Sequence, residues 1–368
     1  MISDAELCEG VRRLRGGPRL EVRVRGRAPL AGPEIGSGAR FERIALELDG
    51  AVHRTVLKVM AADPLWVGFE QRFCEELAAA LPARVPRVYG TGSVAGQPDG
   101  WVLLEEFPVP RRWTPARAFD ALREIARVHA ATLGRAPEWL PRPFARDLAA
   151  SFAHTLEGLA RLEALQAREP LVRDLATPRA LALARALLAA PDAFRAAFAG
   201  SPECVVHRDF HPGNVWLPPS GPPILFDWES VCAGPPIFDA TLLTQYLDVR
   251  QLRIPWRRAE VGFFLPGVPV WSELERAYLD ALDEASGGAA PREAVASAAN
   301  GAFAWEALLR LGWCASQLEE HAFPRTALRL RQWPWLRALG GLGDRAAMYA
   351  AWHAMFADFE ARAAAILG

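Results

Sequence analysis

The spacing of apolar residues changes once along the chain, and that change constrains the fold more than any other feature. Between Leu20 and about residue 60, apolar and polar residues alternate in short runs, as they do in β-strands. From about Thr114 onward, alanine, leucine and arginine dominate and the apolar residues recur with the period of a helix. We therefore predict an α+β chain with a small β-rich amino-terminal part and a larger, mainly α-helical remainder.

The β-rich part contains signals for individual elements. Asp49-Gly50 joins two β-prone runs, and this dipeptide favours a tight hairpin turn. The apolar residues of 64–82 are spaced for one helical face, and Pro82 ends the pattern. The run WVLLEEF, residues 101–107, has the composition of a buried strand.

A proline-rich connector, PVPRRW, follows residue 107 and separates the two patterns. We place a domain boundary there. Residues 1–107 are expected to form an amino-terminal lobe with a sheet and one helix, and residues 108–368 a helical carboxy-terminal lobe. The chain has 368 residues, of which 51% are hydrophobic, so it is long enough to bury two cores.

Composition excludes several classes of protein. The formal net charge is -1, so no overall field attracts nucleic acid or an anionic membrane surface. No apolar run is long enough to span a bilayer, and the first ten residues lack the pattern of a signal peptide. The five cysteines are scattered without paired spacing, which fits a reducing cytoplasm. These features predict a cytoplasmic protein with no nucleic-acid or membrane partner.

One strand-like segment interrupts the helical part: CVVHRDFHPGNVWLPPSGPPILFDWES, residues 204–230. The turn PPSGPP separates two short apolar runs, so we expect a hairpin that brings Asn214, at the start of one strand, close to Asp227, at the end of the other. Asp209 lies five residues before Asn214, on a loop bent by Pro212. Three oxygen-bearing side chains are therefore expected at one end of a hairpin.

This set of side chains suits phosphoryl transfer. Carboxylate and amide oxygens are the ligands that Mg²⁺ prefers, and the ion is normally shared with phosphate oxygens. A further carboxylate near the ion can orient or deprotonate an attacking hydroxyl. Positioning and charge neutralisation do most of the catalysis in such reactions. The same residues also fit a metal site of another class or a satisfied polar core.

The segment resembles the active site of a known superfamily. HRDFHPGN followed by LFDWE is similar to the catalytic loop and metal-binding motif of the aminoglycoside phosphotransferase and choline kinase superfamily. The resemblance covers roughly residues 20–245 and implies a two-lobed, protein-kinase-like fold. It implies that Asp209 orients or deprotonates the acceptor hydroxyl, and that Asn214 and Asp227 bind magnesium.

The resemblance also extends to residues that support the catalytic loop. GPPIFDATLL is similar to the family segment in which an aspartate, here Asp239, holds the loop, and His207 is expected to bond nearby backbone. Most members have a glycine after the first histidine of the loop, whereas this chain has Arg208, as protein kinases do. No regulatory role follows for Arg208, because no long activation loop lies between Asp227 and Asp239.

The amino-terminal part supplies candidates for nucleotide binding. The resemblance implies that Lys58 contacts the α- and β-phosphates, that Glu70 fixes Lys58, and that the backbone of Glu105–Phe107 binds the adenine edge. Lys58 is also the only lysine in the chain; every other basic residue is arginine, and the two side chains differ in size and hydrogen-bond geometry. Gly36 and Gly38, in a GSG turn, would let backbone amides approach the phosphates.

Together these features predict a small-molecule kinase that transfers the γ-phosphoryl group of ATP, or GTP, to a hydroxyl with Mg²⁺ as cofactor. An aminoglycoside, an amino alcohol and a sugar fit equally well as acceptors. The sequence carries no signal for an oligomeric state.

Two other functions stay open at this point. A pseudokinase would bind nucleotide without transferring phosphate, and a metallohydrolase could use the H-x-D-x-H stretch of His207, Asp209 and His211 to bind zinc. Individual residues keep alternatives too. Glu229 is expected to contact metal-bound water, a substrate or a structural hydrogen-bond partner. His211 is expected to contact either the loop or a substrate. His129, on a helical stripe, is expected to be a satisfied core histidine.

Overall fold

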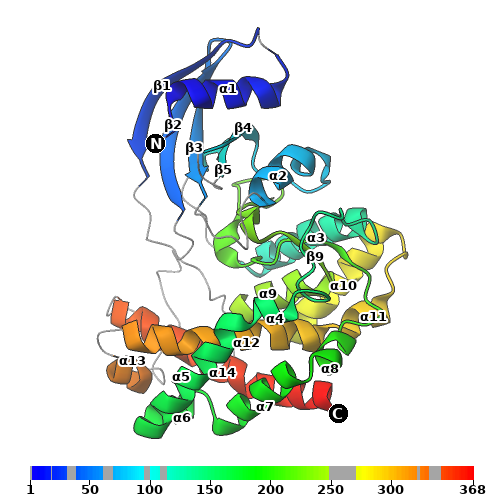
Figure 1. Cartoon of the computed structure of the whole chain (residues 1–368). Helices are drawn as coiled ribbons and strands as arrows, with labels where there is room; N and C mark the ends of the chain where they lie inside the picture. Colours follow the sequence, from blue (N-terminus) through cyan, green and yellow to red (C-terminus); the bar gives the residue numbers. More distant parts are fainter. Residues whose placement is uncertain are drawn as a thin grey trace. The chain divides into compact units, whose positions relative to one another are not determined.

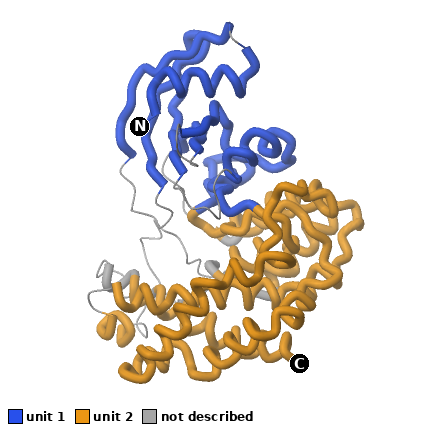
Figure 2. Tube along the Cα trace, in the orientation of Figure 1, with its two compact units in different colours: residues 1–111, 214–231 blue, residues 112–213, 232–368 orange. Residues whose placement is uncertain are grey.

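The computed structural model describes residues 2–17, 19–30, 39–60, 69–94, 100–107, 114–247, 271–320, 324–330 and 341–368 (Figure 1). The chain divides into two compact units (Figure 2). Unit 1 comprises Met1–Arg111 and Asn214–Val231, and unit 2 comprises Arg112–Gly213 and Cys232–Gly368. Contacts therefore group part of the central segment with the amino-terminal sheet. The lobe boundary expected after residue 107 stays a prediction.

Unit 1 is built on a five-stranded antiparallel sheet in the order β1-β2-β3-β5-β4. The Asp49-Gly50 turn joins β2 to β3 as predicted, and both turn residues have positive φ, 46° and 83°. β3 is a central strand, in which Lys58 pairs with Phe41 on one side and Val102 on the other. The strands are β1 Val22–Pro29, β2 Arg40–Leu48, β3 Ala51–Val59, β4 Val88–Ser93 and β5 Gly100–Glu105.

Two helices accompany this sheet. α1, Asp4–Arg15, was not predicted, although Ser3 and Glu6 form a capping box at its start. Its buried apolar side chains, Leu7 and Val11, belong to the same core as Leu57 and Trp101 of the sheet. α2, Phe69–Glu76, lies within the helix predicted over 64–82 and is followed by a 3₁₀ turn, η1 Ala78–Ala80.

The central segment forms two short β-ladders in different units. β7, Val215–Trp216, pairs with β8, Ile224–Leu225, which confirms the predicted hairpin. This hairpin is tied to unit 1 because Leu225 N–H donates to the Arg84 carbonyl at 3.0 Å. β6, Cys204–Val206, instead pairs with β9, Cys232–Gly234, a strand that the sequence analysis did not predict. Two 3₁₀ turns complete the segment, η2 Pro212–Asn214 and η3 Trp228–Ser230.

Unit 2 is mainly helical, as expected. Its core includes Trp305 on α12, whose ring packs against Phe144, Phe152 and Phe194. The described helices are α3 Pro115–Thr132, α4 Leu148–Ser151, α5 Ala153–Arg168, α6 Pro170–Leu175, α7 Pro178–Ala189, α8 Pro191–Ala196, α9 Ile237–Leu247, α10 Trp271–Ser286, α11 Arg292–Ser297, α12 Ala299–Glu320, α13 Pro324–Leu330 and α14 Gly341–Leu367.

The predicted fold class is confirmed: a β-rich amino-terminal unit and a larger, mainly helical unit. Within the ranges that the structure describes, no helix combines the length and apolar character needed to span a membrane.

Candidate active site

Three carboxylates surround the ammonium group of Lys58 in unit 1. Lys58 Nζ lies 2.7 Å from Glu70 Oε2, 2.5 Å from Asp227 Oδ1 and 2.8 Å from Glu229 Oε2. An ammonium group has three hydrogens, so each carboxylate can accept one. β3, α2 and the turn after β8 thus meet at one charged cluster. The structure brings Lys58, Glu70 and Asp227 together as the sequence predicts.

Burial and charge act against each other in this cluster. The Lys58 side chain is 4% exposed, and burial alone would lower the pKa of its ammonium. The charges of Glu70, Asp227 and Glu229 outweigh this effect and hold the pKa well above its usual range, so Lys58 stays charged. Burial raises the pKa of Glu70 to about 7, against the opposing charge of Lys58.

Apolar packing explains how α2 presents Glu70 to the cluster. The rings of Phe73, one turn along α2, and Trp228 stack with centroids 4.3 Å apart and planes 11° from parallel. Trp228 directly follows Asp227, and its indole N–H donates to the Leu225 carbonyl at 3.0 Å. One aromatic contact therefore fixes both the helix that carries Glu70 and the turn that carries Asp227.

Asn214 and Asp227 lie at the same end of the β7–β8 hairpin. The Phe226 N–H donates to the Asn214 carbonyl at 3.1 Å, immediately before Asp227. Asp227 has φ 66° and ψ 62°, a left-handed conformation that is rare outside glycine and often marks functional positions. Asn214 is buried.

The carboxylates that contact Lys58 lie close to one another. Oxygens of Glu70, Asp227 and Glu229 all lie within 4.8 Å of one another. Such a set of carboxylates is typical of hard-cation sites. The position of Asn214 at the same hairpin end adds an amide oxygen to the candidates. Glu229, left open by the sequence analysis, therefore belongs to this cluster.

The loop that carries Asp209 is held by buried hydrogen bonds in unit 2. Asp239 Oδ2 accepts the His207 N–H at 2.7 Å, and Asp239 Oδ1 accepts the Arg208 N–H at 2.8 Å. The Asp209 N–H donates to His207 Nδ1 at 3.3 Å. Arg208 has a left-handed backbone with φ 67°. These are the contacts that supporting roles for His207 and Asp239 require.

Asp209 is held in its ionised form. Burial by itself would raise the pKa of its carboxyl, but a hydrogen bond from His211 and the charges of His211, His207 and Arg310 bring the pKa well below its usual range. His211 Nε2 lies 3.5 Å from Asp209 Oδ2, and His211 Nδ1 accepts the Gly213 N–H at 2.9 Å. His211 therefore contacts the loop, one of the two roles left open for it.

The structure describes two of the four other residues that were predicted to bind nucleotide. Phe107 stacks on Trp216 of β7, with centroids 5.0 Å apart. The Glu105 carboxylate accepts the Arg87 N–H at 3.3 Å at the end of β5. Gly36 and Gly38 lie outside the described residues.

Glu306 and Arg310 lie one turn apart on α12, and charges on a helix face are usually solvated. Glu306 is 4% exposed and its carboxylate lies 3.6 Å from the Arg310 guanidinium. Burial raises the pKa of Glu306 against the opposing charge of Arg310, and the charge of Asp209 adds to the increase. Their i,i+4 spacing was visible in the sequence, but their burial was not.

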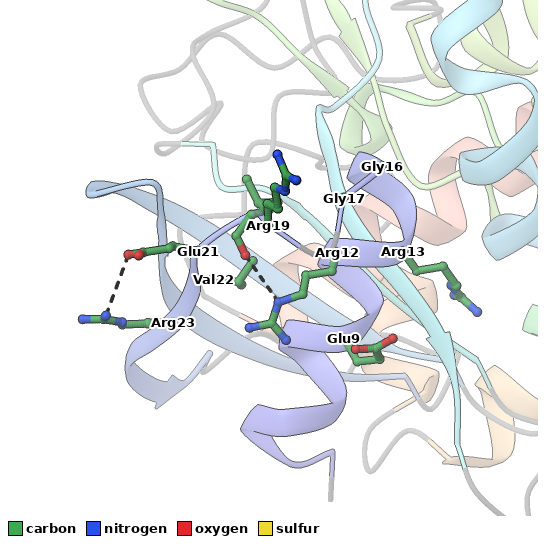
Figure 3. Close-up of a pocket in the computed structure, with 10 residues that line it drawn as sticks. Glu9, Arg12, Arg13, Gly16, Gly17, Arg19, Glu21, Val22 and Arg23 are labelled. Carbon is green, nitrogen blue, oxygen red and sulfur yellow. Dashed lines mark hydrogen bonds and ion pairs between the residues drawn. The ribbon is translucent and has the colours of Figure 1, made fainter.

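A separate pocket of about 790 Å³ lies between α1 and β1 (Figure 3). Three of the arginines that line it have partners within unit 1. Arg12 donates to the Leu20 carbonyl at 3.4 Å, Arg13 to the Thr91 carbonyl at 2.8 Å, and Arg23 lies 3.8 Å from Glu21. We assign this pocket no role in the chemistry of the Lys58 cluster.

Comparison with known proteins places this site in a family. The model of the phosphotransferase enzyme family matches residues 32–276, two thirds of the chain. The chain belongs to the phosphotransferase enzyme family. The match covers the Lys58 cluster and the Asp209 loop but not α1 or β1. No curated protein matches the sequence.

The chain is also similar to several proteins of known structure. An aminoglycoside-3'-phosphotransferase of type VIII is 22% identical, with 83% of this chain and 98% of that chain covered and a TM-score of 0.43. Macrolide 2'-phosphotransferase MphH from Brachybacterium faecium is 17% identical, with 89% and 97% covered and a TM-score of 0.47. Choline kinase LicA from Streptococcus pneumoniae is 14% identical, with 87% and 94% covered and a TM-score of 0.46.

Proposed function

We propose that this protein is a small-molecule kinase that transfers the γ-phosphoryl group of ATP or GTP to a hydroxyl of a small acceptor. Membership of the phosphotransferase enzyme family supports the reaction class. The observation that carries the proposal is the Lys58 cluster, in which the only lysine of the chain is buried beside Glu70 and Asp227.

In this proposal the residues of unit 1 bind the nucleotide. Lys58, oriented by Glu70, holds the α- and β-phosphates, and Asn214 and Asp227 hold magnesium. The ion, when bound, would neutralise phosphate charge. Because Asp227 pairs with Lys58 at 2.5 Å, a cation bound by Asp227 would take over part of the charge that Lys58 now balances. The backbone of Glu105–Phe107 binds the base.

Gly36 and Gly38 cover the phosphates in this proposal, through the amides of the GSG turn. Asp209 acts on the acceptor. Its lowered pKa keeps it ionised at neutral pH, so it can orient the acceptor hydroxyl and accept its proton. A bond then forms between the acceptor oxygen and the γ-phosphorus, and the bond between that phosphorus and the β,γ-bridging oxygen breaks. His207 and Asp239 keep the loop in place through the backbone hydrogen bonds described above.

The proposed acceptor is a small alcohol in the cytoplasm. Aminoglycosides, amino alcohols and sugars are the classes to test first. The proposal includes no nucleic-acid or membrane partner, in keeping with the net charge of -1.

A screen of phosphate acceptors with both nucleotides tests the proposal. We expect wild-type protein to transfer labelled γ-phosphate to at least one class of alcohol. Asp209→Asn serves as the blank, because it keeps the shape of the side chain but cannot accept the proton, and transfer should fall by at least about 100-fold. Normal transfer by Asp209→Asn would contradict the proposed mechanism.

The same screen separates the proposal from a pseudokinase, which would bind nucleotide and transfer nothing. The metallohydrolase alternative is less well supported. The ring nitrogens His207 Nδ1 and His211 Nδ1 both accept backbone N–H groups. Within the described part of the chain, the group of side chains close enough to share an ion is the carboxylate cluster around Lys58.

A further inference from the structure

A stripe of three side chains on α12, in unit 2, becomes more exposed along the helix. Glu306, Arg310 and Trp313 follow one another at intervals of four and three residues, so they lie on one face of the helix. Glu306 is buried, the Arg310 side chain is 21% exposed and Trp313 is 46% exposed. The stripe therefore runs from the interior of unit 2 to its surface.

The buried end of this stripe lies next to the loop of Asp209. The central carbon of the Arg208 guanidinium is 5.7 Å from the ring centroid of Trp305. Arg208 directly precedes Asp209 in the loop. Trp305 directly precedes Glu306 on α12. In keeping with this contact, the charge of Arg310 is one of the causes that lower the pKa of the Asp209 carboxyl. The loop therefore packs against α12 where the stripe begins.

Burial decides which member of the Glu306–Arg310 pair can meet a ligand. Glu306 Oε2 lies 3.6 Å from Arg310 Nη2, which makes the contact an ion pair but is too long for a hydrogen bond. The Glu306 side chain is 6% exposed, less than a third of the value for Arg310. The carboxylate therefore balances the guanidinium from the buried side, and the guanidinium is the charge that the stripe presents outward.

Trp313 supplies an apolar surface beside this guanidinium. The central carbon of the Arg310 guanidinium lies 5.9 Å from the ring centroid of Trp313, within the range of a cation–π contact. The Trp313 ring in turn lies 6.0 Å from the ring of Trp352 on α14, centroid to centroid. These contacts hold the guanidinium and the exposed ring side by side, an arrangement that suits a ligand with both an anionic group and an apolar body.

We propose that the acceptor alcohol carries a carboxylate, and that Arg310 is the specificity-determining residue that binds this carboxylate. The acceptor hydroxyl then meets Asp209, and the body of the acceptor packs on Trp313. A planar guanidinium matches a carboxylate with two parallel hydrogen bonds, which a neutral or cationic group cannot form. Hydroxy acids and sugar acids are acceptors of this class. The inference rests on the proposed function, since it names the substrate of that site.

The stripe disfavours a cationic acceptor. An ammonium group would have to move Arg310 aside to reach the buried Glu306, and the guanidinium would repel it. The charges of His211, His207 and Arg310 all lower the pKa of Asp209, so positive groups also act on the carboxylate that meets the hydroxyl. An amino alcohol should therefore be a poorer acceptor than the matching hydroxy acid.

Matched acceptors and labelled γ-phosphate test the proposal. One set is glucose, glucuronic acid and glucosamine, and the other is glycerol, glyceric acid and serinol. The members of each set differ chiefly in charge. We expect wild type to prefer an acid over its neutral and amino partners by at least about tenfold in kcat/KM, the effect of hydrogen bonds to a charged group. Equal or faster phosphorylation of the neutral or amino member would overturn the inference and leave the proposed function standing.

Arg310→Gln tests the residue itself. We expect the KM for the acid to rise at least about tenfold, whereas the KM for the neutral member stays within about twofold. Arg310→Lys keeps the charge and should keep part of the preference. Arg161→Gln is the control: Arg161 also pairs with a glutamate of α12, Glu319, but both side chains are exposed, so this variant should match wild type. An unchanged preference in Arg310→Gln would overturn the role of Arg310.

Direct binding separates failure of this inference from failure of the proposed function. Saturation-transfer nuclear magnetic resonance detects the same compounds on the whole chain without turnover. If nothing is phosphorylated, the proposed function fails, but acids that bind wild type and bind Arg310→Gln at least about tenfold more weakly would still support the carboxylate site. Equal binding of all members of a set, equal binding to both proteins, or no binding of either acid would overturn it.

Discussion

Lys58 is the residue whose chemistry is hardest to replace. Its compact ammonium lies within 2.8 Å of three carboxylate oxygens, one from α2 and two from the turn after β8. A planar guanidinium has a fixed fork of donors and needs more room, so it cannot keep all three contacts. The chain uses arginine at every other basic position, which makes arginine the informative substitution.

We predict that Lys58→Arg keeps the fold but lowers kcat/KM for nucleotide by at least about 100-fold, a loss expected when one positioned donor to phosphate is misplaced. Steady-state kinetics measure the effect. Arg25→Lys is the control: Arg25 is on β1 of the same sheet, is exposed, and pairs with Glu47, outside the residues proposed to bind nucleotide, so kcat/KM should not change. Equal kinetics for Lys58→Arg and wild type would show that Lys58 is not the phosphate ligand.

The acid limb of the pH–rate profile reports on Asp209. Because its pKa is lowered, Asp209 stays ionised as the pH falls from neutrality, and activity that depends on it is lost only when the pH passes below the usual aspartate range. His211→Gln removes one cause of this lowering. We expect the acid limb to move to higher pH, whereas His353→Gln, on an exposed part of α14, should leave it in place. An acid limb that does not move would contradict the role of His211.

Some residues of the candidate site could be predicted because their type or spacing is unusual in this sequence. The solitary lysine, the Asp-Asn spacing of the loop and the Asp before Trp228 all stand out in the printed sequence. Glu229 was ambiguous because a carboxylate two residues from Asp227 can point toward the same site or away from it. Glu306 was not predictable, because nothing in the pattern shows that this helical glutamate is buried near Asp209.

At the scale of elements, hairpins joined by short turns were predictable from the sequence, whereas the pairing of strands far apart in the chain was not. The Asp49-Gly50 hairpin and the β7–β8 hairpin were predicted because their turn residues are adjacent in sequence. β9 was missed because its partner, β6, lies more than twenty residues away and the strand is only three residues long. α1 was missed although its capping box, Ser3 with Glu6, was readable.

The crossing of α5 and α12 depends on two glycines. A Cβ at Gly158 would lie 1.8 Å from the Gly312 carbonyl oxygen, which is backbone and cannot move aside. We predict that Gly158→Ala lowers the free energy of unfolding by about 2–3 kcal/mol or more. Urea unfolding measures it. Gly26→Ala, where a Cβ meets nothing within 4 Å, should change stability by no more than about 0.5 kcal/mol. Similar stability of the two variants would mean that the helices cross less closely.

At the scale of the whole molecule, the change of periodicity near residue 110 was enough to predict two units of different class. It could not show that residues 214–231 pack with the sheet unit, since that grouping depends on contacts such as Leu225 with Arg84. One consequence is that Lys58, Glu70 and Asp227 belong to a single unit despite a separation of 169 residues between Lys58 and Asp227. The residues proposed to bind nucleotide phosphates and metal therefore lie within one unit.

The central proposal is that Lys58 binds the nucleotide phosphates while Asn214 and Asp227 hold the magnesium ion that accompanies the nucleotide. Calorimetric titration of a non-hydrolysable ATP or GTP analogue, with and without Mg²⁺, tests it most directly. We predict magnesium-dependent binding to wild type and to Asp209→Asn, and a loss of at least about tenfold in affinity for Asp227→Asn. Binding of equal strength with and without magnesium, unchanged in Asp227→Asn, would contradict the claim.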